Sequence, residues 1–203
     1  MSILLPLFPL DLVLLPGNSL PLHIFEPRYR EMISECLERK EPFGVVRAKE
    51  EGIAEIGCTA EIISLSKKYD DGRMDVLTQG RERFEILQVN QERSFLQGEI
   101  VYLVDEADKA STEEKAQAIK LHGELIALAG ERVVDLAKIA DQRLSFYLAG
   151  SLPIDPDLKQ TLLETSSEAE RVRILINFLQ SILPNVRRTI HVRQKAGGNG
   201  HAS

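Results

Sequence analysis

The sequence has no tryptophan, few other aromatic residues and no long uninterrupted run of apolar residues. Aromatic residues make up 5% of the 203 residues, which argues against a nucleic-acid platform that stacks bases on aromatic rings. No stretch of about 18 consecutive apolar residues occurs, so the sequence predicts no membrane-spanning segment. With 43% hydrophobic and 28% charged residues, the composition is that of a soluble globular protein with a sizeable core.

Cysteine and histidine are also scarce. The two cysteines, Cys36 and Cys58, lie in segments of apolar pattern, which excludes a disulfide framework and favours the reducing cytoplasm. The four histidines are scattered, and neither Cys-x-x-Cys nor His-Glu-x-x-His occurs, so we expect no metal and no cofactor. We interpret His23 as a strand-end histidine with an ordinary hydrogen-bond partner.

Motifs of catalysis are absent as well. The sequence has no Gly-x-Ser-x-Gly elbow and no Gly-x-x-x-x-Gly-Lys-Ser/Thr loop, so it offers neither an activated serine nor a phosphate cradle. Ser151 follows a glycine at an expected helix end, where a small polar residue is common. The carboxylates Asp70 and Asp71 precede Gly72 and are typical of a turn. We therefore predict a protein that is not an enzyme.

The charge is unevenly distributed along the chain. Residues 1–107 carry 12 basic and 19 acidic side chains, residues 108–186 carry 9 and 12, and residues 187–203 carry 4 and none. The acidic body repels phosphate backbones, so the composition disfavours nucleic-acid binding. Residues 187–203 are predicted to be a basic, disordered tail.

What is present begins with a leader of short apolar runs interrupted by prolines between Leu5 and Arg30. Such runs are too short for long helices, and they predict short strands and tight turns. The leader has no basic n-region and carries Asp11, so it does not resemble a secretory signal. A helix is expected from Pro27, because apolar residues from Tyr29 to Leu37 recur at helical spacing.

The two halves of the chain differ in hydrophobic period. Residues 1–107 show alternation typical of strands, with a hairpin at Asp71-Gly72 and further strands at 84–86 and 95–103. From residue 108 the period changes to about 3.6 residues. Four helices are expected there, at about 111–129, 135–149, 155–164 and 167–184, with capping boxes at Ser111 and Ser167. The predicted domains are 1–107 and 108–186.

Several motifs carry a family resemblance. They are Pro6 to Arg30 with its Phe25-Glu26-Pro27-Arg28-Tyr29 core, Phe43-Gly44-Val45-Val46, Ile56 to Ala60, Asp71-Gly72-Arg73, Gly80 to Phe84, Lys159-Gln160, Leu162-Leu163-Glu164 and Arg171. Over roughly residues 3 to 183 the chain resembles the N-terminal, substrate-binding domain of the ATP-dependent Lon protease.

The resemblance implies an α+β protein: an N-terminal antiparallel β pseudo-barrel of the PUA-like type with one inserted helix, followed by a four-helix subdomain. It also implies a stand-alone, non-catalytic module that binds unfolded polypeptide or a protein partner, since the motifs of the Lon ATPase and peptidase domains are missing. Because PUA-like barrels often bind RNA, an RNA-binding module is the alternative function. A small-molecule binder or an unrecognised enzyme is the third.

The residues that we predict to contact a partner are Pro16, Leu20, Phe25, Arg28, Tyr29, Arg81 and Arg83. The apolar members can fill shallow pockets beside an extended peptide, and the arginines can contact acidic groups. Each also has a structural interpretation, which is core packing for the apolar residues. For Arg28 we favour a buried or half-buried ion pair with Glu26 that ties the barrel to its helix.

Overall fold

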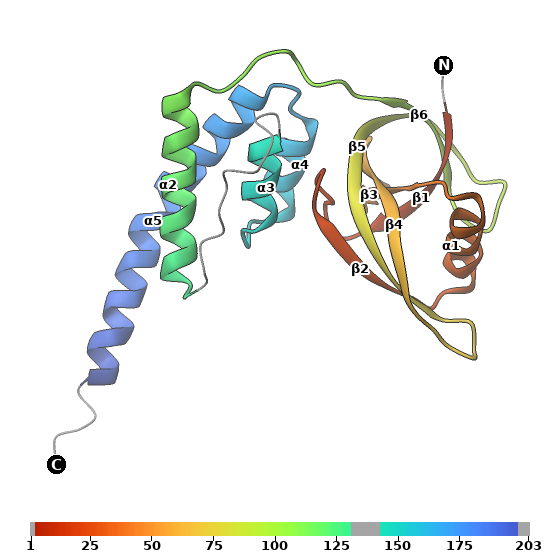
Figure 1. The fold of residues 1–203 in the computed structure, drawn as a ribbon, viewed down its shortest axis with the longest axis horizontal. Coiled ribbons are helices and arrows are strands. Elements are labelled where there is room, and N and C mark those ends of the chain that lie inside the picture. The colour runs from red at the N-terminus through yellow and green to blue at the C-terminus, as the bar shows by residue number, and fades with distance from the viewer. Residues whose placement is uncertain (1–2, 131–142, 199–203) are drawn as a thin grey trace. The chain divides into compact units, whose positions relative to one another are not determined.

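Strands come first along the chain and most of the helices follow (Figure 1). The computed structural model describes residues 3–130 and 143–198, with side chains up to residue 190. The elements are β1 (Ile3–Leu10), β2 (Ser19–Ile24), α1 (Pro27–Arg39), β3 (Phe43–Arg47), β4 (Ile56–Lys68), β5 (Met74–Asn90), β6 (Gln97–Tyr102), α2 (Thr112–Leu128), α3 (Leu144–Gly150), α4 (Pro156–Glu164) and α5 (Glu168–Gly198). The α+β class predicted from the sequence is confirmed.

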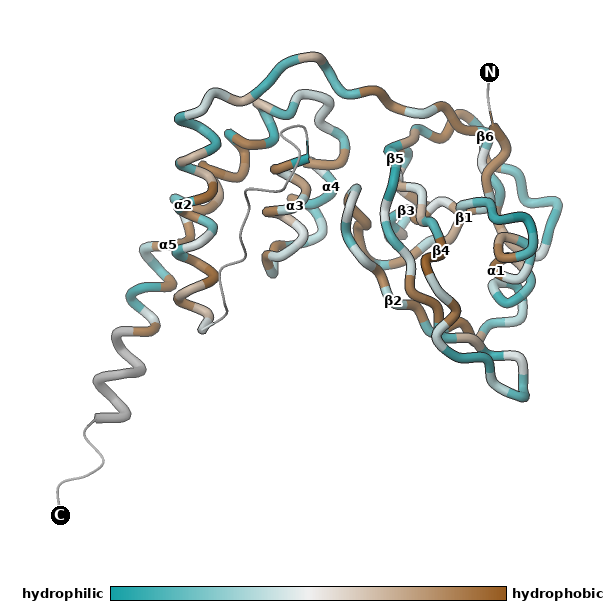
Figure 2. The backbone as a smooth tube through the Cα atoms, in the orientation of Figure 1, coloured by the Kyte–Doolittle hydropathy of each residue, from teal (hydrophilic) through white to brown (hydrophobic). Residues whose placement is uncertain are grey.

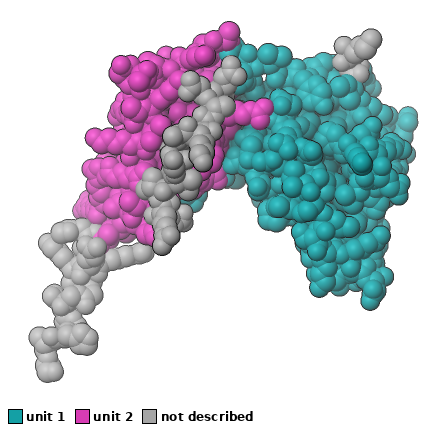
Figure 3. All heavy atoms as spheres, viewed as in Figure 1, with its two compact units in different colours: residues 1–106, 153–166 teal, residues 107–152, 167–203 magenta. Residues whose placement is uncertain are grey.

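The chain divides into two units (Figure 3). Unit 1 consists of Met1–Glu106 and Pro153–Ser166, and unit 2 of Ala107–Leu152 and Ser167–Ser203. The first division, after Glu106, lies next to the predicted boundary at residue 107. The segment that contains α4 differs from the prediction, because it joins the strands of unit 1 and not the helices of unit 2.

The six strands of unit 1 form one sheet in the order β2-β5-β4-β3-β1-β6. The long strand β5 also pairs with β6. The series of neighbouring strands β5-β4-β3-β1-β6 therefore leads back to β5, and β2 lies outside this series. The sheet is mixed and not purely antiparallel, because β1 and β3 are parallel. A parallel pair requires a long crossover, and β2 with α1 provides it. The two strands predicted around Met74 and Phe84 are one continuous strand, β5.

A small apolar cluster, contributed by strands β1, β3, β5 and β6, forms a core of unit 1. Its buried members are Leu5, Leu7, Val46, Phe84 and Ile100. The Phe84 ring is packed so closely that a Cβ built on Gly57 would lie 2.6 Å from its Cζ atom. No side chain larger than hydrogen fits that position without displacement of its neighbours, so the glycine is required by packing.

The predicted helix and hairpin are both present in unit 1. Helix α1 begins at Pro27 as expected and buries Tyr29, Met32, Ile33 and Cys36. The β4–β5 hairpin turns at Asp71-Gly72, where Gly72 has a φ of 86°. Asp71 keeps a negative φ, and its carboxylate accepts a hydrogen bond of 3.1 Å from the backbone N–H of Arg73. The predicted turn role of these acidic residues is confirmed for Asp71.

Unit 2 contains α2, α3 and α5. Ser111 and Glu114 form the predicted capping box at the start of α2. The apolar stripe of α5 is buried at Val172, Leu175, Ile176, Leu179 and Leu183, and Figure 2 shows apolar and polar stretches alternating along this helix. Helix α3 covers the end of the helix predicted at 135–149, and the earlier part of that prediction lies outside the described residues.

Helix α5 extends beyond its predicted end. The sequence predicts a stop at Pro184 and disorder from residue 187, whereas α5 continues to Gly198 with Pro184 inside it. An interior proline removes one backbone hydrogen bond but does not always end a helix. After Pro184, Arg187 donates a hydrogen bond of 2.6 Å to Glu124 of α2, which ties the continuing helix to its neighbour.

Candidate functional site

The seven residues predicted to contact a partner lie in unit 1 but do not form one cluster. They divide among a first pocket (Arg81), a second pocket (Arg28 and Tyr29), the region of strand β2 (Leu20 and Phe25) and the buried interior (Pro16 and Arg83). The structure therefore separates residues that the sequence could only group by residue type and resemblance.

The first pocket has a volume of about 470 Å³ and lies among the end of α1 and strands β4, β5 and β6. Leu37, Ile62 and Tyr102 provide apolar surface in it. On its polar side, Arg81 Nε donates a hydrogen bond of 2.5 Å to Glu61. Both charged side chains are about half exposed, so the pair can reorganise around a bound group at small cost.

The second pocket has a volume of about 430 Å³ and is lined by Arg28 and Tyr29 of α1 and by the loop between β5 and β6. Two guanidinium groups stack on aromatic rings there. Arg28 lies 4.6 Å from the centre of the Tyr29 ring, and Arg93 lies 4.4 Å from that of Phe95. Burial raises the pKa of Tyr29, which keeps its hydroxyl group protonated and able to donate.

Arg93 of the second pocket is neutralised by two glutamates of α1. It forms ion pairs with Glu31, at 2.8 Å, and with Glu35. A hydrogen bond from Ser94, followed by that from Arg93, lowers the pKa of Glu31, and the hydrogen bond from Arg93 lowers that of Glu35. This arrangement fixes the β5–β6 loop against α1 and leaves Arg28 as the more accessible cation of the pocket.

The favoured interpretation of Arg28 is wrong in one respect. Its ion pair with Glu26 exists, at 2.8 Å, and it is half-buried as expected, since the two side chains are 52% and 40% exposed. The difference is its role: Glu26 and Arg28 both lie at the start of α1, so the pair connects neighbouring residues and does not tie the helix to the sheet. The reason is that Pro27 begins α1 and turns its first residues toward solvent, while Tyr29 on the next position is buried.

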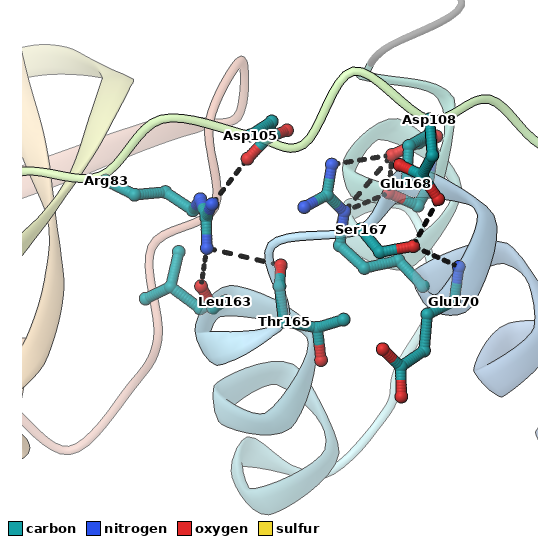
Figure 4. Close-up of polar contacts among 10 residues, drawn as sticks. Arg83, Asp105, Asp108, Leu163, Thr165, Ser167, Glu168 and Glu170 are labelled. Carbon is teal, nitrogen blue, oxygen red and sulfur yellow. Dashed lines mark hydrogen bonds and ion pairs between the residues drawn. The ribbon is translucent and has the colours of Figure 1, made fainter.

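Arg83 is a buried structural residue. Its side chain is 3% exposed and donates hydrogen bonds to the carbonyl oxygens of Leu163, at 2.7 Å, and Thr165, at 3.2 Å, and it also pairs with Asp105 (Figure 4). The carbonyl groups at the end of α4 have no partner within the helix, and a cation there is favourable. Arg83 thus holds α4 against β5 within unit 1.

The β2 region presents the other apolar candidates. Phe25 follows the strand and is 60% exposed, and Leu20 lies half-buried within it. Near the end of β2, His23 Nδ1 lies 2.6 Å from Asp75 of β5, in line with its interpretation as a partnered strand-end histidine. The hydrogen bond from His23, with a second from Tyr69, lowers the pKa of Asp75. Pro16 is buried in the turn before β2.

Unit 2 contains a buried ion pair at the start of α5. Arg171 and Glu168 are 0% and 2% exposed and lie 2.8 Å apart. Glu168 also accepts hydrogen bonds from the backbone and the hydroxyl group of Ser145. Beside this pair, Ser167 accepts from the Glu170 backbone and donates to Asp108 (Figure 4). These contacts organise the beginning of α5, and none of these side chains lines either of the two pockets of unit 1.

The structure brings one serine and one histidine together, also in unit 2. His122 Nε2 lies 2.7 Å from Ser151 Oγ, and the Ser151 hydroxyl donates to the carbonyl oxygen of Leu148 at 3.0 Å. Nε2 must then carry the hydrogen of the His122–Ser151 bond, so His122 cannot accept a proton from Ser151 as a general base would. Burial lowers the pKa of His122, which keeps the ring neutral. This pair is structural.

Other reactive chemistry is not concentrated in the described residues. Burial raises the pKa of the Cys36 thiol to about 11, which makes it a poor nucleophile at neutral pH. Within residues 3–130 and 143–198, the described His, Cys, Asp and Glu side chains form no group of three that could hold a metal ion. Among the same residues, no helix combines the length and apolarity needed to cross a bilayer.

Sequence reasoning missed several residues that organise these sites. Asp105, which pairs with Arg83, belongs to no motif, and Gln160, which donates to the carbonyl oxygen of Ile56, belongs to a resemblance motif but was given no role. Glu168 had a usable signal, because it lies three residues before Arg171 at the start of an apolar stripe. Nothing in the sequence alone showed that β2 would be a terminal strand of the sheet.

Comparison with known proteins gives a consistent result. Residues 4–181 match the family described as the ATP-dependent protease La (LON) substrate-binding domain. The chain is 28% identical over 192 residues to a Lon protease of Anaeromyxobacter dehalogenans, covering 86% of this chain and 23% of that protein. It is 33% identical over 122 residues to a Lon protease of Parabacteroides distasonis, covering 55% of this chain and 15% of that protein. The chain thus spans about a quarter or less of these relatives.

Solved structures agree with the architecture. The crystal structure of a Lon N-terminal domain protein from Xanthomonas campestris superposes with a TM-score of 0.70 at 25% identity, covering 86% of this chain and 98% of that one. The N-terminal domain of a Mycobacterium avium complex Lon protease gives a TM-score of 0.67 at 21% identity, with 88% and 98% covered. The second likeness supports the fold alone.

Proposed function

Because the chain belongs to the family of LON substrate-binding domains, we propose that it is a non-catalytic module whose unit 1 binds unfolded polypeptide or an exposed segment of a protein partner. The observation that carries the proposal is the distribution of exposed apolar side chains. Every large apolar side chain that is exposed among the described residues lies in unit 1: Ile3, Leu4, Phe25, Ile63, Leu65, Leu87, Val89, Tyr102 and Val104. Exposed apolar surface concentrated in one part of a protein favours protein contacts.

The two pockets of unit 1 support the same function. Each combines apolar walls with a charged group that is already paired, Arg81 with Glu61 in the first pocket and Arg28 with Glu26 in the second. Such sites accept apolar side chains of many shapes and tolerate charges of either sign. This tolerance suits the binding of unfolded chains, whose sequences vary.

The charge of unit 1 argues against RNA as the main ligand. Its two segments contain 13 basic and 22 acidic residues, so unit 1 has a formal net charge of −9. A phosphate backbone would be repelled by this field. A polypeptide segment rich in lysine or arginine would be attracted to it.

The proposal is tested with one protein in two states. Fluorescein-labelled α-lactalbumin is prepared in its native form and in a reduced, carboxymethylated form that stays unfolded, and fluorescence anisotropy is measured as this protein is added. Saturable binding of the unfolded form, with much weaker binding of the native form, is expected. Equal binding of the two forms, or no binding of either, would contradict the proposal.

Two further measurements in the same buffers separate the alternatives. Tight binding of labelled single-stranded RNA that weakens steeply with added salt would favour the RNA-binding alternative. Release of phosphate from ATP, or fragments of the unfolded lactalbumin, above a control without protein would contradict the non-catalytic assignment.

A further inference from the structure

Strand β2 is the terminal strand of the sheet, and β5 is its sole partner among the described strands (Figure 1). The six residues from Ser19 to Ile24 pair with β5 without any shift of register. Their exposure alternates, with Ser19, Pro21 and His23 exposed and Leu20 and Leu22 half-buried. Because the register is unshifted and no second described strand pairs with β2, its outer edge is a regular template for another strand.

The hydrogen bonds next to β2 determine which backbone groups lie on this outer edge. Gly80 N–H donates to the carbonyl oxygen of Asn18 at 2.9 Å, and the Thr78 hydroxyl donates to that of Leu20 at 2.8 Å. In an antiparallel pair, backbone groups alternate in direction along the strand. Leu20 and Leu22 therefore face β5, and the backbone groups of Ser19, Pro21 and His23 face away from it.

The other open edge of this part of the sheet is less suited to pairing. Strand β4 pairs with β3 through Cys58, Thr59 and Ala60, so its later residues lack a strand on that side. The same strand has three shifts of register against β5, and it carries Lys67 and Lys68. Bulges and lysines are known means of protecting a strand edge. On β2, a single proline, Pro21, removes one donor and leaves the rest of the edge regular.

We propose that the outer edge of β2 binds an extended segment of unfolded polypeptide as an additional antiparallel strand. This inference rests on the proposed function and assigns it a place and a mode of binding. Main-chain hydrogen bonds to Ser19, Pro21 and His23 hold the segment without reading its sequence. Alternate side chains of the segment lie beside the half-buried Leu20 and Leu22, so apolar residues are preferred at every second position.

Charge distinguishes this occupant from a second copy of the chain. Two copies that meet along β2 bring together two units of net charge −9, and their repulsion opposes dimerisation. The positions between the apolar residues of a bound segment face the same side as His23 and the neighbouring Asp75. Basic residues at these positions add favourable long-range attraction to the acidic unit.

The test uses matched pairs of variants at the edge. His23→Pro removes the outward N–H group together with the side chain, whereas His23→Ala removes the side chain alone. Ser19→Pro and Ser19→Ala form a second pair, and proline at Ser19 is compatible with the first position of a strand. Binding of unfolded, carboxymethylated α-lactalbumin is expected to weaken about tenfold in the proline variants relative to their alanine partners. Circular dichroism and thermal melting verify that all four variants are folded.

A synthetic peptide tests the register. The peptide is acetyl-Lys-Val-Lys-Val-Lys-Val-Lys-amide. When its valines lie beside Leu20 and Leu22, its lysines lie opposite Ser19, Pro21 and His23, and the backbone N–H groups of the lysines point toward β2. Methylation of the lysine backbone nitrogens is expected to weaken binding about tenfold or more, and methylation of the valine nitrogens to leave it nearly unchanged. Equal affinity of the two methylated peptides would overturn the proposal.

The outcomes separate this inference from the proposed function. Tight binding of unfolded lactalbumin that is the same in proline and alanine variants would overturn the β2 inference and leave polypeptide binding intact. Absence of binding by the wild-type protein would contradict both. A dimer in solution that His23→Pro converts to a monomer, and that the peptide does not dissociate, would show a second copy on β2 and overturn the inference.

Discussion

Arg83 Nη1 donates a hydrogen bond of 2.7 Å to the carbonyl oxygen of Leu163, which lies 80 residues further along the chain. This contact explains why α4 belongs to unit 1 although it follows α2 and α3 of unit 2 along the chain. It is supported within the same unit by Gln160, which donates to the carbonyl oxygen of Ile56 at 3.0 Å, and by the ion pair of Arg47 with Asp157. These polar contacts act together with the burial of Leu162 and Leu163 to place this short helix.

Replacement of Arg83 is expected to destabilise unit 1. Arg83→Leu leaves the carbonyl oxygens at the end of α4 without their buried donor and leaves Asp105 without this cation, and we expect a loss of about 2 to 4 kcal/mol in the free energy of unfolding. Chemical denaturation monitored by circular dichroism measures the loss. The matched control is Arg81→Leu, two residues earlier and half exposed, with an expected change of less than about 1 kcal/mol. Equal effects of the two substitutions would contradict the structural role of Arg83.

The buried pair in unit 2 predicts a second large effect. Arg171→Met leaves the Glu168 carboxylate buried beside Ser145 without its cation, so we expect a destabilisation of about 3 to 5 kcal/mol. Arg173→Met serves as the control, because its ion pair with Glu114 is exposed on the Arg173 side and contributes less than about 1 kcal/mol. A double variant, Arg171→Met with Glu168→Leu, is expected to recover part of the stability. Failure of the double variant to exceed Arg171→Met would count against this account.

His122 predicts a dependence of stability on pH. Its pKa is lowered by burial in the folded protein, so the unfolded chain binds a proton first as the pH falls. Stability is then fully retained above the unfolded pKa of about 6.5 and is lost as the pH falls below that value, by at most about 1.4 kcal/mol for each pH unit. Thermal melting between pH 7.5 and 5 measures this loss. His122→Gln is expected to flatten the curve in that range, whereas Lys120→Gln, on the exposed side of the same helix, leaves its slope unchanged.

Substitution of Arg28 distinguishes a role in binding from a role in stability. Because the pair of Arg28 with Glu26 is about half exposed, Arg28→Ala is expected to change the free energy of unfolding by less than about 1 kcal/mol. If the second pocket takes part in binding, the same variant weakens binding of unfolded lactalbumin severalfold, and Arg28→Lys weakens it less. Binding that stays unchanged in Arg28→Ala would remove this pocket from the proposed surface.

Local signals in the sequence were sufficient for much of the fold. The start of α1 at Pro27, the hairpin at Gly72 and the capping box at Ser111 depend on interactions within a few residues, and each is present. The parallel pairing of β1 with β3 and the placement of α4 in unit 1 depend on contacts between distant segments. A single sequence does not show which distant segments are in contact. The prediction therefore had an antiparallel barrel and placed α4 with the other C-terminal helices.

The candidate site was harder to predict for the same reason. Residue type and resemblance selected Arg81 and Arg83 together. Two residues apart on a regular strand they would share a face, but the register of β5 against β4 shifts between Gly80 and Arg83, and Arg81 is half exposed whereas Arg83 is buried. Pro16, chosen as a lining residue, is buried in a turn, whereas the outward backbone groups of Ser19 and His23 carry no signal in their side chains. Backbone edges are visible only once the strand order is known.

Hydrogen–deuterium exchange, measured with and without a saturating amount of unfolded, carboxymethylated α-lactalbumin, tests the central claim most directly. If unit 1 binds extended polypeptide along β2, the amides of Ser19 and His23 exchange more slowly in the complex, and the amides of α2 and α5 exchange at unchanged rates. Slower exchange confined to unit 2, or no change anywhere in the chain at saturation, would contradict the claim.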